Sequence, residues 1–487
     1  MTVPTPISTG TANTSIPRLL ELATTIVHQT ALLTAHLETN SLPEPNFTPD
    51  APYPAETPKF LSIHRTLSAA LDTLQYLVDG PHRTLRTLLC RANDLAAFQV
   101  AFDFGFFTLI PRDGEMALEE IVARTGVDVD RAGRCLRMMA THRVFVEKSP
   151  GVFAHTAASW VLGGDEDARC AGHYMLDEMW KAATRTSECL KIEASARPTP
   201  TTDATACTTD GGTQATPFSV HFGVPMFTYY AQKPEYAARF AKAMAGATKV
   251  DRQITELCNE FPWDTLEGTV VDVGGGSGHV SMELAKVLPP LAMSHRTKRL
   301  IKLLQKYPKL NFIIQDASLD MLAQGRAILS TTSSSTTTGD TSSLSSRITF
   351  TQHDFLTPQP VRNAAAFIIR QCTHNWSDAD VVRIFQSLVP GLEGSVAATP
   401  LLINDTILPE AGAVSAYEER ALRQMDMLMM VGLGAKQRSR REFVELLKRA
   451  DERFVVKRVR AEGSMGLLEV VLRTAGETDD EMSSKGI

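Results

Sequence analysis

The chain has 487 residues, of which 43% are hydrophobic and 21% charged, with a formal net charge of -6. This length predicts two or three globular units, and the slight acidity gives no general attraction to nucleic acid or anionic membranes. We expect no signal peptide and no membrane span, because no stretch has the required apolar character. Seven scattered cysteines without a CxxC pair argue against disulfides and structural zinc, so we expect a cytoplasmic protein without a metal.

The N-terminal part, residues 1–58, is predicted to contain one helix and a proline-rich extension. Apolar residues at helical spacing predict the helix over 17–38, with Pro17 in its first turn. The segment SLPEPNFTPDAPYPAETP follows, and its prolines are incompatible with a helix.

Residues 59–195 are predicted to form one domain, in which the stretch from about 59 to 163 contains several short helices and then two short strands. MALEEIVARTG predicts a helix stopped by Gly126, and DVDRAGRCLRMMATHR a second helix capped by Asp128 or Asp130. VFVEKSPGVFAHT predicts a β-hairpin. Helix, turn, helix and hairpin together give the outline of a winged helix.

This outline leaves a DNA-binding regulator open as an alternative function. Arg131, Arg134 and Arg137 recur every three residues on the second helix and could contact phosphates. The acidic balance of the whole chain argues against this alternative.

A low-complexity linker, 196–216, precedes an α/β domain over 217–475. Apolar strands alternate there with helices, which predicts a mostly parallel sheet covered by helices on both faces. The Ser/Thr-rich stretch 330–346 is predicted to be a disordered insertion and 476–487 a tail. The predicted strands are TVVDVG, NFIIQDA, ITFTQHD, AAFIIRQC, LLINDTI and FVVKRVRA.

The stretch VVDVGGGSGHVSMELAKVL predicts a strand, a glycine turn and a helix. Gly274, Gly276 and Gly278 allow positive φ angles and close approach of a ligand. A dinucleotide site fits poorly, since His279 or Ser281 stands where the third glycine of GxGxxG would be. A tight turn without a ligand is the other alternative.

The fourth predicted strand runs into RQCTHNWSD. Ser377 is a plausible helix N-cap, so His374 falls in the loop at the carboxyl end of a central strand, where open α/β sheets bind ligands. A lone histidine is more often a structural residue, but this position favours a general base. Arg370 lies inside the strand and needs an acceptor for its charge.

Six motifs, in order along residues 60–474, resemble those of plant-type and fungal O-methyltransferases. That resemblance implies a homodimer with a winged-helix dimerisation domain and a Rossmann-like class I methyltransferase domain. It also implies S-adenosylmethionine-dependent methylation of a hydroxyl on a phenolic or polyketide-like small molecule, without metal, nucleic acid or membrane. The motifs are FSVHFGVPMFTYYAQKPEYAARFAKAMAG, VVDVGGGSGHV, FIIQDAS, RQCTHNWSD, LLINDTILPEAG and MDMLMMVGLGAKQRSRREFVELLKRA.

The resemblance also assigns roles to individual residues. His374 matches the general base, and Asp405 and Gln437 stand where acids usually flank it. Cofactor-binding residues would be Asp272, Gly274, Gly276, Gly278, Asp316 at the ribose, Asp354 beside the adenine, Phe355 and Arg370. Acceptor-binding residues would be Phe227, Tyr230, Met244, Trp376 and Met429.

Three departures from the family pattern surround His374. Asn375 replaces the Asp of HDW, Asp405 is one methylene shorter than the usual Glu, and Gln437 replaces a second Glu. A histidine between Asp and Gln should be a weaker base than one between two carboxylates. A family member that binds the cofactor without turning it over therefore remains an alternative.

Overall fold

A computed structural model describes residues 19–52, 57–196, 215–250, 257–258, 261–285, 309–334, 346–461 and 463–473. The chain divides into two compact units, residues 1–164 with 415–418, and residues 165–414 with 419–487. Pro17, the tail and most of the predicted linker and insertion lie outside the described residues. Within the described part of the chain, no helix is both long and apolar enough to cross a membrane.

The first unit begins with two helices, α1 (Leu19–Thr39) and α2 (Pro58–Asp103). Thr57 caps α2 by accepting a hydrogen bond from the Phe60 amide at 3.1 Å. Instead of the first of several short helices, α2 is one 46-residue element with a kink. The kink is at Gly80, where φ is 65° just before Pro81, because proline cannot continue the helical hydrogen bonds.

The winged helix is confirmed in the first unit. Gly126 ends the first of its two helices with φ 72°, and the Asp128 carboxylate caps the second by accepting from the Arg131 amide. The three short strands form an antiparallel sheet in the order β1-β3-β2. The elements are α3 (Phe106–Leu109), β1 (Glu115–Ala117), α4 (Leu118–Thr125), α5 (Val129–Thr141), β2 (Phe145–Ser149), β3 (Val152–His155) and α6 (Ala157–Gly164).

Two of the three arginines on α5 are paired with carboxylates of the same unit. Arg137 holds Glu147 through Nε at 3.1 Å and Nη2 at 2.9 Å, and Arg134 lies 3.6 Å from Asp130. These contacts reduce the charge that α5 could offer to a phosphate backbone.

The second unit opens with a layer of helices, and α7 packs along α12 within it. The contact is close: a Cβ on Gly246 would lie 2.2 Å from the carbonyl oxygen of Asp167. Because of this packing, the division between units falls after Gly164, whereas we expected a boundary at residue 195. The layer comprises α7 (Glu166–Tyr174), the π-helix η1 (Met175–Trp180), α8 (Lys181–Ala183), α9 (Thr186–Ala196), α10 (Pro217–Phe222), α11 (Met226–Gln232) and α12 (Pro234–Val250).

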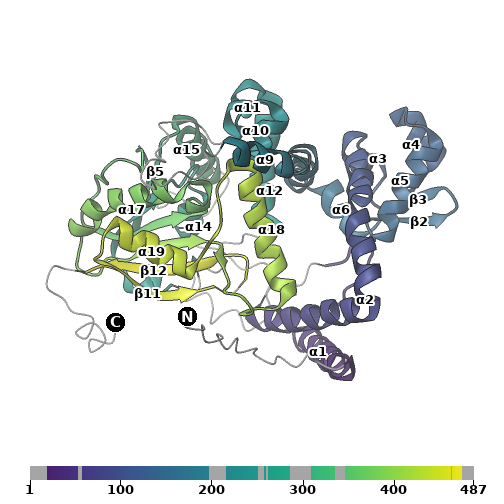
Figure 1. Ribbon diagram of the computed structural model, residues 1–487, viewed down its shortest axis with the longest axis horizontal. Coiled ribbons are helices and arrows are strands. Elements are labelled where there is room, and N and C mark those ends of the chain that lie inside the picture. The colour runs from purple at the N-terminus through teal and green to yellow at the C-terminus, as the bar shows by residue number, and fades with distance from the viewer. Residues whose placement is uncertain are drawn as a thin grey trace, which may run out of the picture. The chain divides into compact units, whose positions relative to one another are not determined.

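A seven-stranded sheet follows, in the order β11-β12-β8-β7-β4-β5-β6. Its strands β11 and β12 lie side by side in Figure 1. The pairs from β6 to β8 are parallel, and β12 is antiparallel to both of its neighbours. All six predicted strands are present, and β12 is an additional one. The strands are β4 (Gly268–Val273), β5 (Leu310–Asp316), β6 (Ile348–Gln352), β7 (Ala364–Arg370), β8 (Leu401–Asp405), β11 (Phe454–Arg460) and β12 (Gly466–Leu472).

Helices and short elements connect these strands. The helix α15 extends through residue 334, so the first residues of the predicted insertion are helical, as expected when a helix propagates cooperatively past its apolar positions. The connecting elements are η2 (Trp263–Thr265), α14 (His279–Ala285), α15 (Leu319–Ser334), η5 (Thr373–Asn375), α17 (Asp378–Glu393), β9 (Ile407–Leu408), α18 (Ala416–Leu433), β10 (Arg438–Ser439) and α19 (Arg440–Ala450).

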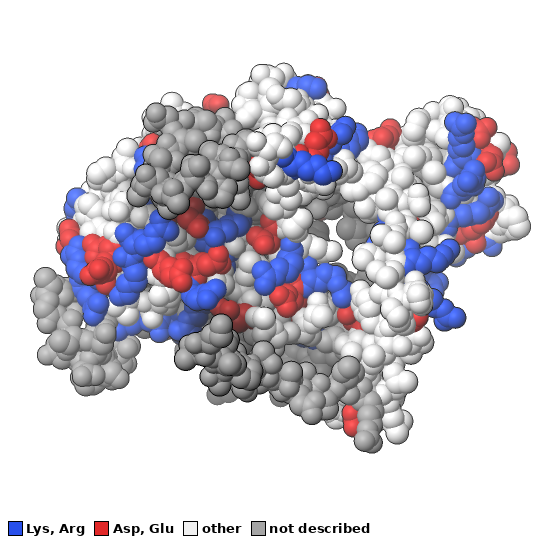
Figure 2. Space-filling model, in the orientation of Figure 1, with Lys and Arg blue, Asp and Glu red and all other residues white. Residues whose placement is uncertain are grey.

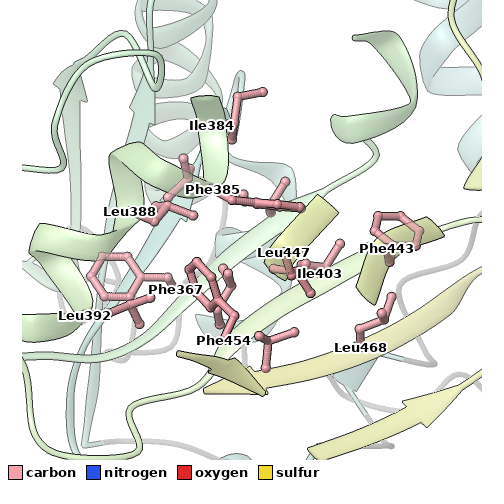
Figure 3. Packing of buried hydrophobic residues seen from close by; sticks show 14 of the residues in the cluster. Phe367, Ile384, Phe385, Leu388, Leu392, Ile403, Phe443, Leu447, Phe454 and Leu468 are labelled. Atoms are coloured by element: carbon pink, nitrogen blue, oxygen red, sulfur yellow. The ribbon is translucent and has the colours of Figure 1, made fainter. Parts of the chain in front are cut away.

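Two hydrophobic cores lie on opposite faces of this sheet, because side chains alternate along each strand. On β7, Phe367 belongs to the core formed with α17 and α19, where it lies near Phe385 and Leu388 (Figure 3). The neighbouring Ile368 belongs to the other core, with Leu322 of α15. With both faces covered, the carboxyl ends of the parallel strands are the natural ligand edge.

The surface of the second unit carries both signs of charge. Basic and acidic side chains are interspersed over the region of α17, α19 and β11 in the view of Figure 2. The described residues on this face therefore form no extended patch of one sign, such as would attract a polyanion.

Candidate active site

The glycine turn after β4 forms a backbone cradle. Gly274, Gly276 and Gly278 have φ angles of 70°, 57° and 76°, which L side chains rarely adopt. The turn is held by the Gly275 amide, which donates to the Gln315 carbonyl at 2.9 Å, and by the Gly276 amide, which donates to Asp316 at 3.0 Å. The positive φ angles predicted for the three glycines are confirmed.

Asp272 lies beneath this cradle, and its side chain is buried. Ser281 donates a hydrogen bond of 2.8 Å to its carboxylate, and a Cβ on Gly275 would lie 2.6 Å from the carboxyl carbon. Burial raises the pKa of Asp272 to about 6, although Ser281 and the charge of Arg370 act in the opposite direction. The carboxyl group is thus part of the support of the turn.

The two acids at the next strand ends differ in their surroundings. Asp316 is half-buried, and besides Gly276 it accepts a hydrogen bond from the Ser318 amide at 2.8 Å. A carboxylate has about four acceptor sites, so Asp316 can still accept two hydroxyl groups of a ribose diol. Asp354 is exposed and accepts from the Leu356 amide at 2.9 Å.

Phe355 and Trp376 lie beside the glycine turn. A Cβ on Gly274 would lie 3.1 Å from the Phe355 ring, and the Phe355 and Trp376 rings meet edge to face with centroids 5.5 Å apart. Trp376, predicted to contact the acceptor, is therefore next to Phe355, predicted to contact the cofactor.

Arg370 is buried at the end of β7 and donates a hydrogen bond to Asn404 of β8. Asn404 in turn donates to the Gly466 carbonyl of β12 at 2.7 Å. Asn404 supplies the acceptor that the buried guanidinium of Arg370 needs. Asn404 was not predicted as a site residue.

His374 and Asp405 form a buried pair. The Nδ1 of His374 is hydrogen-bonded to Asp405 Oδ1, and the Thr373 hydroxyl donates to Asp405 Oδ2 at 2.6 Å. Burial alone would raise the pKa of Asp405, but the charge of His374 and the hydrogen bonds from His374, Thr373 and the Thr406 amide together hold it below its usual value. An ionised Asp405 fixes the orientation of the ring and leaves Nε2 for proton transfer.

Arg438 braces the short helix that carries His374, and it was missed at the sequence level. Its guanidinium is almost completely buried and donates to the Thr373 carbonyl at 2.8 Å and to the Trp376 carbonyl at 2.7 Å. It also pairs with Asp378 at 2.8 Å. The sequence does not separate it from the neighbouring Lys436, which is also basic but only half-buried.

Gln437 lies next to Arg438, and its backbone amide donates to Asp426 at 2.9 Å. The residue is 2% exposed, and neither amide atom has a hydrogen-bond partner among the described residues.

The remaining predicted acceptor residues occupy different surroundings. Tyr230 and Met244 belong to one apolar cluster in the helical layer, and the Tyr230 hydroxyl donates to the fully buried Glu178. Met429 on α18 is buried, whereas Phe227 is 60% exposed. Burial and the hydrogen bonds from Tyr230 and Arg239 act in opposite directions on Glu178, and its pKa is raised because burial is the stronger.

Comparisons with known proteins identify relatives of this chain. Residues 88–164 match the profile of an O-methyltransferase dimerisation domain, and residues 202–296 and 328–452 that of an O-methyltransferase domain. The O-methyltransferase sol2 of Alternaria solani is 52% identical over 94% of this chain and 96% of its own length. The chlorophenol O-methyltransferase of Trichoderma longibrachiatum is 29% identical over 95% and 91%.

Solved structures share the fold. OxaC in complex with SAH and oxaline superposes with a TM-score of 0.64 at 19% identity, over 93% of this chain and all of that one. LepI in complex with SAM gives a TM-score of 0.63 at 18% identity, again over 93% and 100%.

Proposed function

The chain belongs to the O-methyltransferase family, and from this premise we propose that it methylates a phenolic hydroxyl of an aromatic or polyketide secondary metabolite, with His374 as general base. Its cofactor is S-adenosylmethionine. The observation that carries the proposal is the buried His374–Asp405 pair at the carboxyl end of β7, on the same edge of the sheet as the glycine turn after β4.

The residues present fit that cofactor. The open glycine turn admits a ligand close to the backbone, and Asp316 retains acceptor capacity for a ribose diol. Asp354 and Phe355 would lie at the adenine. When bound, S-adenosylmethionine supplies an electrophilic methyl group on a positively charged sulfur.

The protein side of the reaction is proton removal and alignment. A phenol with pKa about 10 is mostly protonated at neutral pH. The Nε2 of His374 would take the hydroxyl proton while Asp405, bonded to Nδ1, stabilises the resulting imidazolium. Base catalysis of this kind contributes roughly 10²- to 10⁴-fold, and alignment by Arg438 and Asp405 adds to it.

A homodimer is part of the same proposal, supported by the match of residues 88–164 to a dimerisation domain. Light scattering of the purified protein would test it, and a monomer at micromolar concentration would contradict it.

The activity is tested with methyl-deuterated S-adenosylmethionine and a panel of phenols, anthraquinones and xanthones, analysed by mass spectrometry. We expect a product heavier by one labelled methyl group with the wild type and a loss of roughly 10²- to 10⁴-fold in rate for His374→Ala. Calorimetry should show equal cofactor binding by both. Binding without any turnover would favour the degenerate family member, and full activity of His374→Ala would remove the base assignment.

A further inference from the structure

Gln437 has a buried side chain whose amide group is not hydrogen-bonded to any described residue. Both Nε2 and Oε1 lack a hydrogen-bond partner among the described residues, and the residue is 2% exposed. A buried amide without partners costs free energy, so a bound molecule that supplies them would be favoured.

The backbone places Gln437 beside the His374–Asp405 pair. The strands β10 and β9 are parallel, and Arg438 pairs with Ile407, two residues after Asp405. Arg438 also bonds the carbonyl oxygens of Thr373 and Trp376, on either side of His374. Gln437 is thus next to the segments that hold both members of the pair.

We propose that Gln437 binds the acceptor molecule next to the hydroxyl that is methylated, with Nε2 donating to a carbonyl oxygen on the adjacent ring position. The acceptor class is then a ring-bound hydroxyl flanked by a carbonyl, a narrower class than phenols in general. This inference rests on the proposed function of the site.

The chemistry of an amide explains this choice. A carboxylate can only accept hydrogen bonds, whereas an amide also donates. In a hydroxy-carbonyl compound the hydroxyl proton is held by an internal hydrogen bond to the carbonyl oxygen. When Nε2 of Gln437 donates a hydrogen bond to that carbonyl oxygen, the internal hydrogen bond of the acceptor is weakened. The hydroxyl proton is then free to transfer to Nε2 of His374.

The test compares two matched acceptors, 1-hydroxy-2-acetonaphthone and 2-ethyl-1-naphthol, which differ by the carbonyl oxygen. The enzymes are the wild type, Gln437→Met, which has similar volume and no hydrogen bonding, and Gln437→Glu, which only accepts when its carboxyl group is ionised. We expect the ratio of kcat/KM for the ketone over the naphthol to fall about 10- to 100-fold in both variants. Methionine also removes a buried unpaired amide, so ligand-free Gln437→Met should melt about 2–4 °C higher than the wild type.

An unchanged ratio in folded variants that still bind S-adenosylmethionine would overturn the assignment of Gln437 while leaving the phenolic function intact. An equal loss for both acceptors would do the same, because it indicates that Gln437 only positions His374. Turnover of the naphthol but not the ketone by the wild type would overturn this inference alone, whereas turnover of neither compound and of no member of the phenol panel would overturn the proposed function as well.

Discussion

Arg438 and Thr373 are 65 residues apart in the chain, yet the guanidinium of Arg438 donates a 2.8 Å hydrogen bond to the Thr373 carbonyl. The same guanidinium bonds the Trp376 carbonyl, so the backbone around His374 is held from both ends. The orientation of the base thus depends on a buried charge outside its own strand and loop.

Arg438→Met should therefore lower kcat about 10- to 100-fold, because a small misplacement of the base is costly. It should also lower the free energy of unfolding by about 1–3 kcal/mol, since the Thr373 and Trp376 carbonyls lose a buried donor. Arg453→Met is a matched control, because Arg453 pairs with Glu393 and Asp451 at a more exposed position. Steady-state kinetics and denaturant titration measure both effects, and an unchanged kcat in folded Arg438→Met would contradict the bracing role.

Asp405→Asn should reduce kcat roughly 10²- to 10⁴-fold with little change in cofactor affinity. An amide can donate to Nδ1 of His374, which would leave the proton on Nε2 and block the base.

The lowered pKa of Asp405 also means that its contribution to stability is present above pH about 4 and lost as pH falls through the folded pKa. Denaturant unfolding of the wild type and Asp405→Asn between pH 3 and 7 measures this dependence. A difference in free energy of unfolding that grows towards low pH would contradict it.

For Asp272 we expect the opposite dependence of stability on pH. Its folded pKa is about 6 against an ordinary value of 3.8, so between these values the folded protein keeps a proton that the unfolded chain has lost. Stability from this group is full below pH about 4 and is lost as pH rises through 6, at a cost of about 3 kcal/mol.

The variant Asp272→Asn cannot titrate and isolates this effect. Relative to it, the wild type should lose about 3 kcal/mol of stability between pH 4 and 7.5 in the absence of cofactor. Urea unfolding across this range measures the difference. Parallel curves for the two proteins would show that the carboxyl group titrates normally.

Tyr230→Phe should lower the free energy of unfolding by about 1–3 kcal/mol, because Glu178 is fully buried and loses a donor. Phe227→Ala is the matched control among the predicted acceptor residues, since its exposed side chain should change stability by less than about 0.5 kcal/mol. Equal stabilities of the two variants would show that the bond between Tyr230 and Glu178 contributes nothing.

Local signals in the sequence were enough to predict the winged helix and six of the seven sheet strands. Gly126 and Asp128 end and begin helices through their own backbone and side-chain chemistry, so neighbouring residues suffice to place them. The strand β12 was not predicted, and its position in the sheet is fixed by pairing with β8, about 60 residues earlier.

The site was predictable to the extent that it lies at strand ends. Asp272, Asp316 and His374 follow apolar runs, and parallel strands bring their carboxyl ends together. Arg438, Asn404 and Glu178 were not predicted, because their roles depend on tertiary contacts with groups 34 to 65 residues away.

The chain of hydrogen bonds from Arg370 through Asn404 to the Gly466 carbonyl crosses three neighbouring strands, β7, β8 and β12. The strand β12 is the last of the seven along the sequence, so this chain of hydrogen bonds is completed only when β12 pairs with β8. A chain that stopped before β12 would leave the Asn404 amide without its acceptor. The ordered, buried position of Arg370 therefore depends on the pairing of β12 with β8.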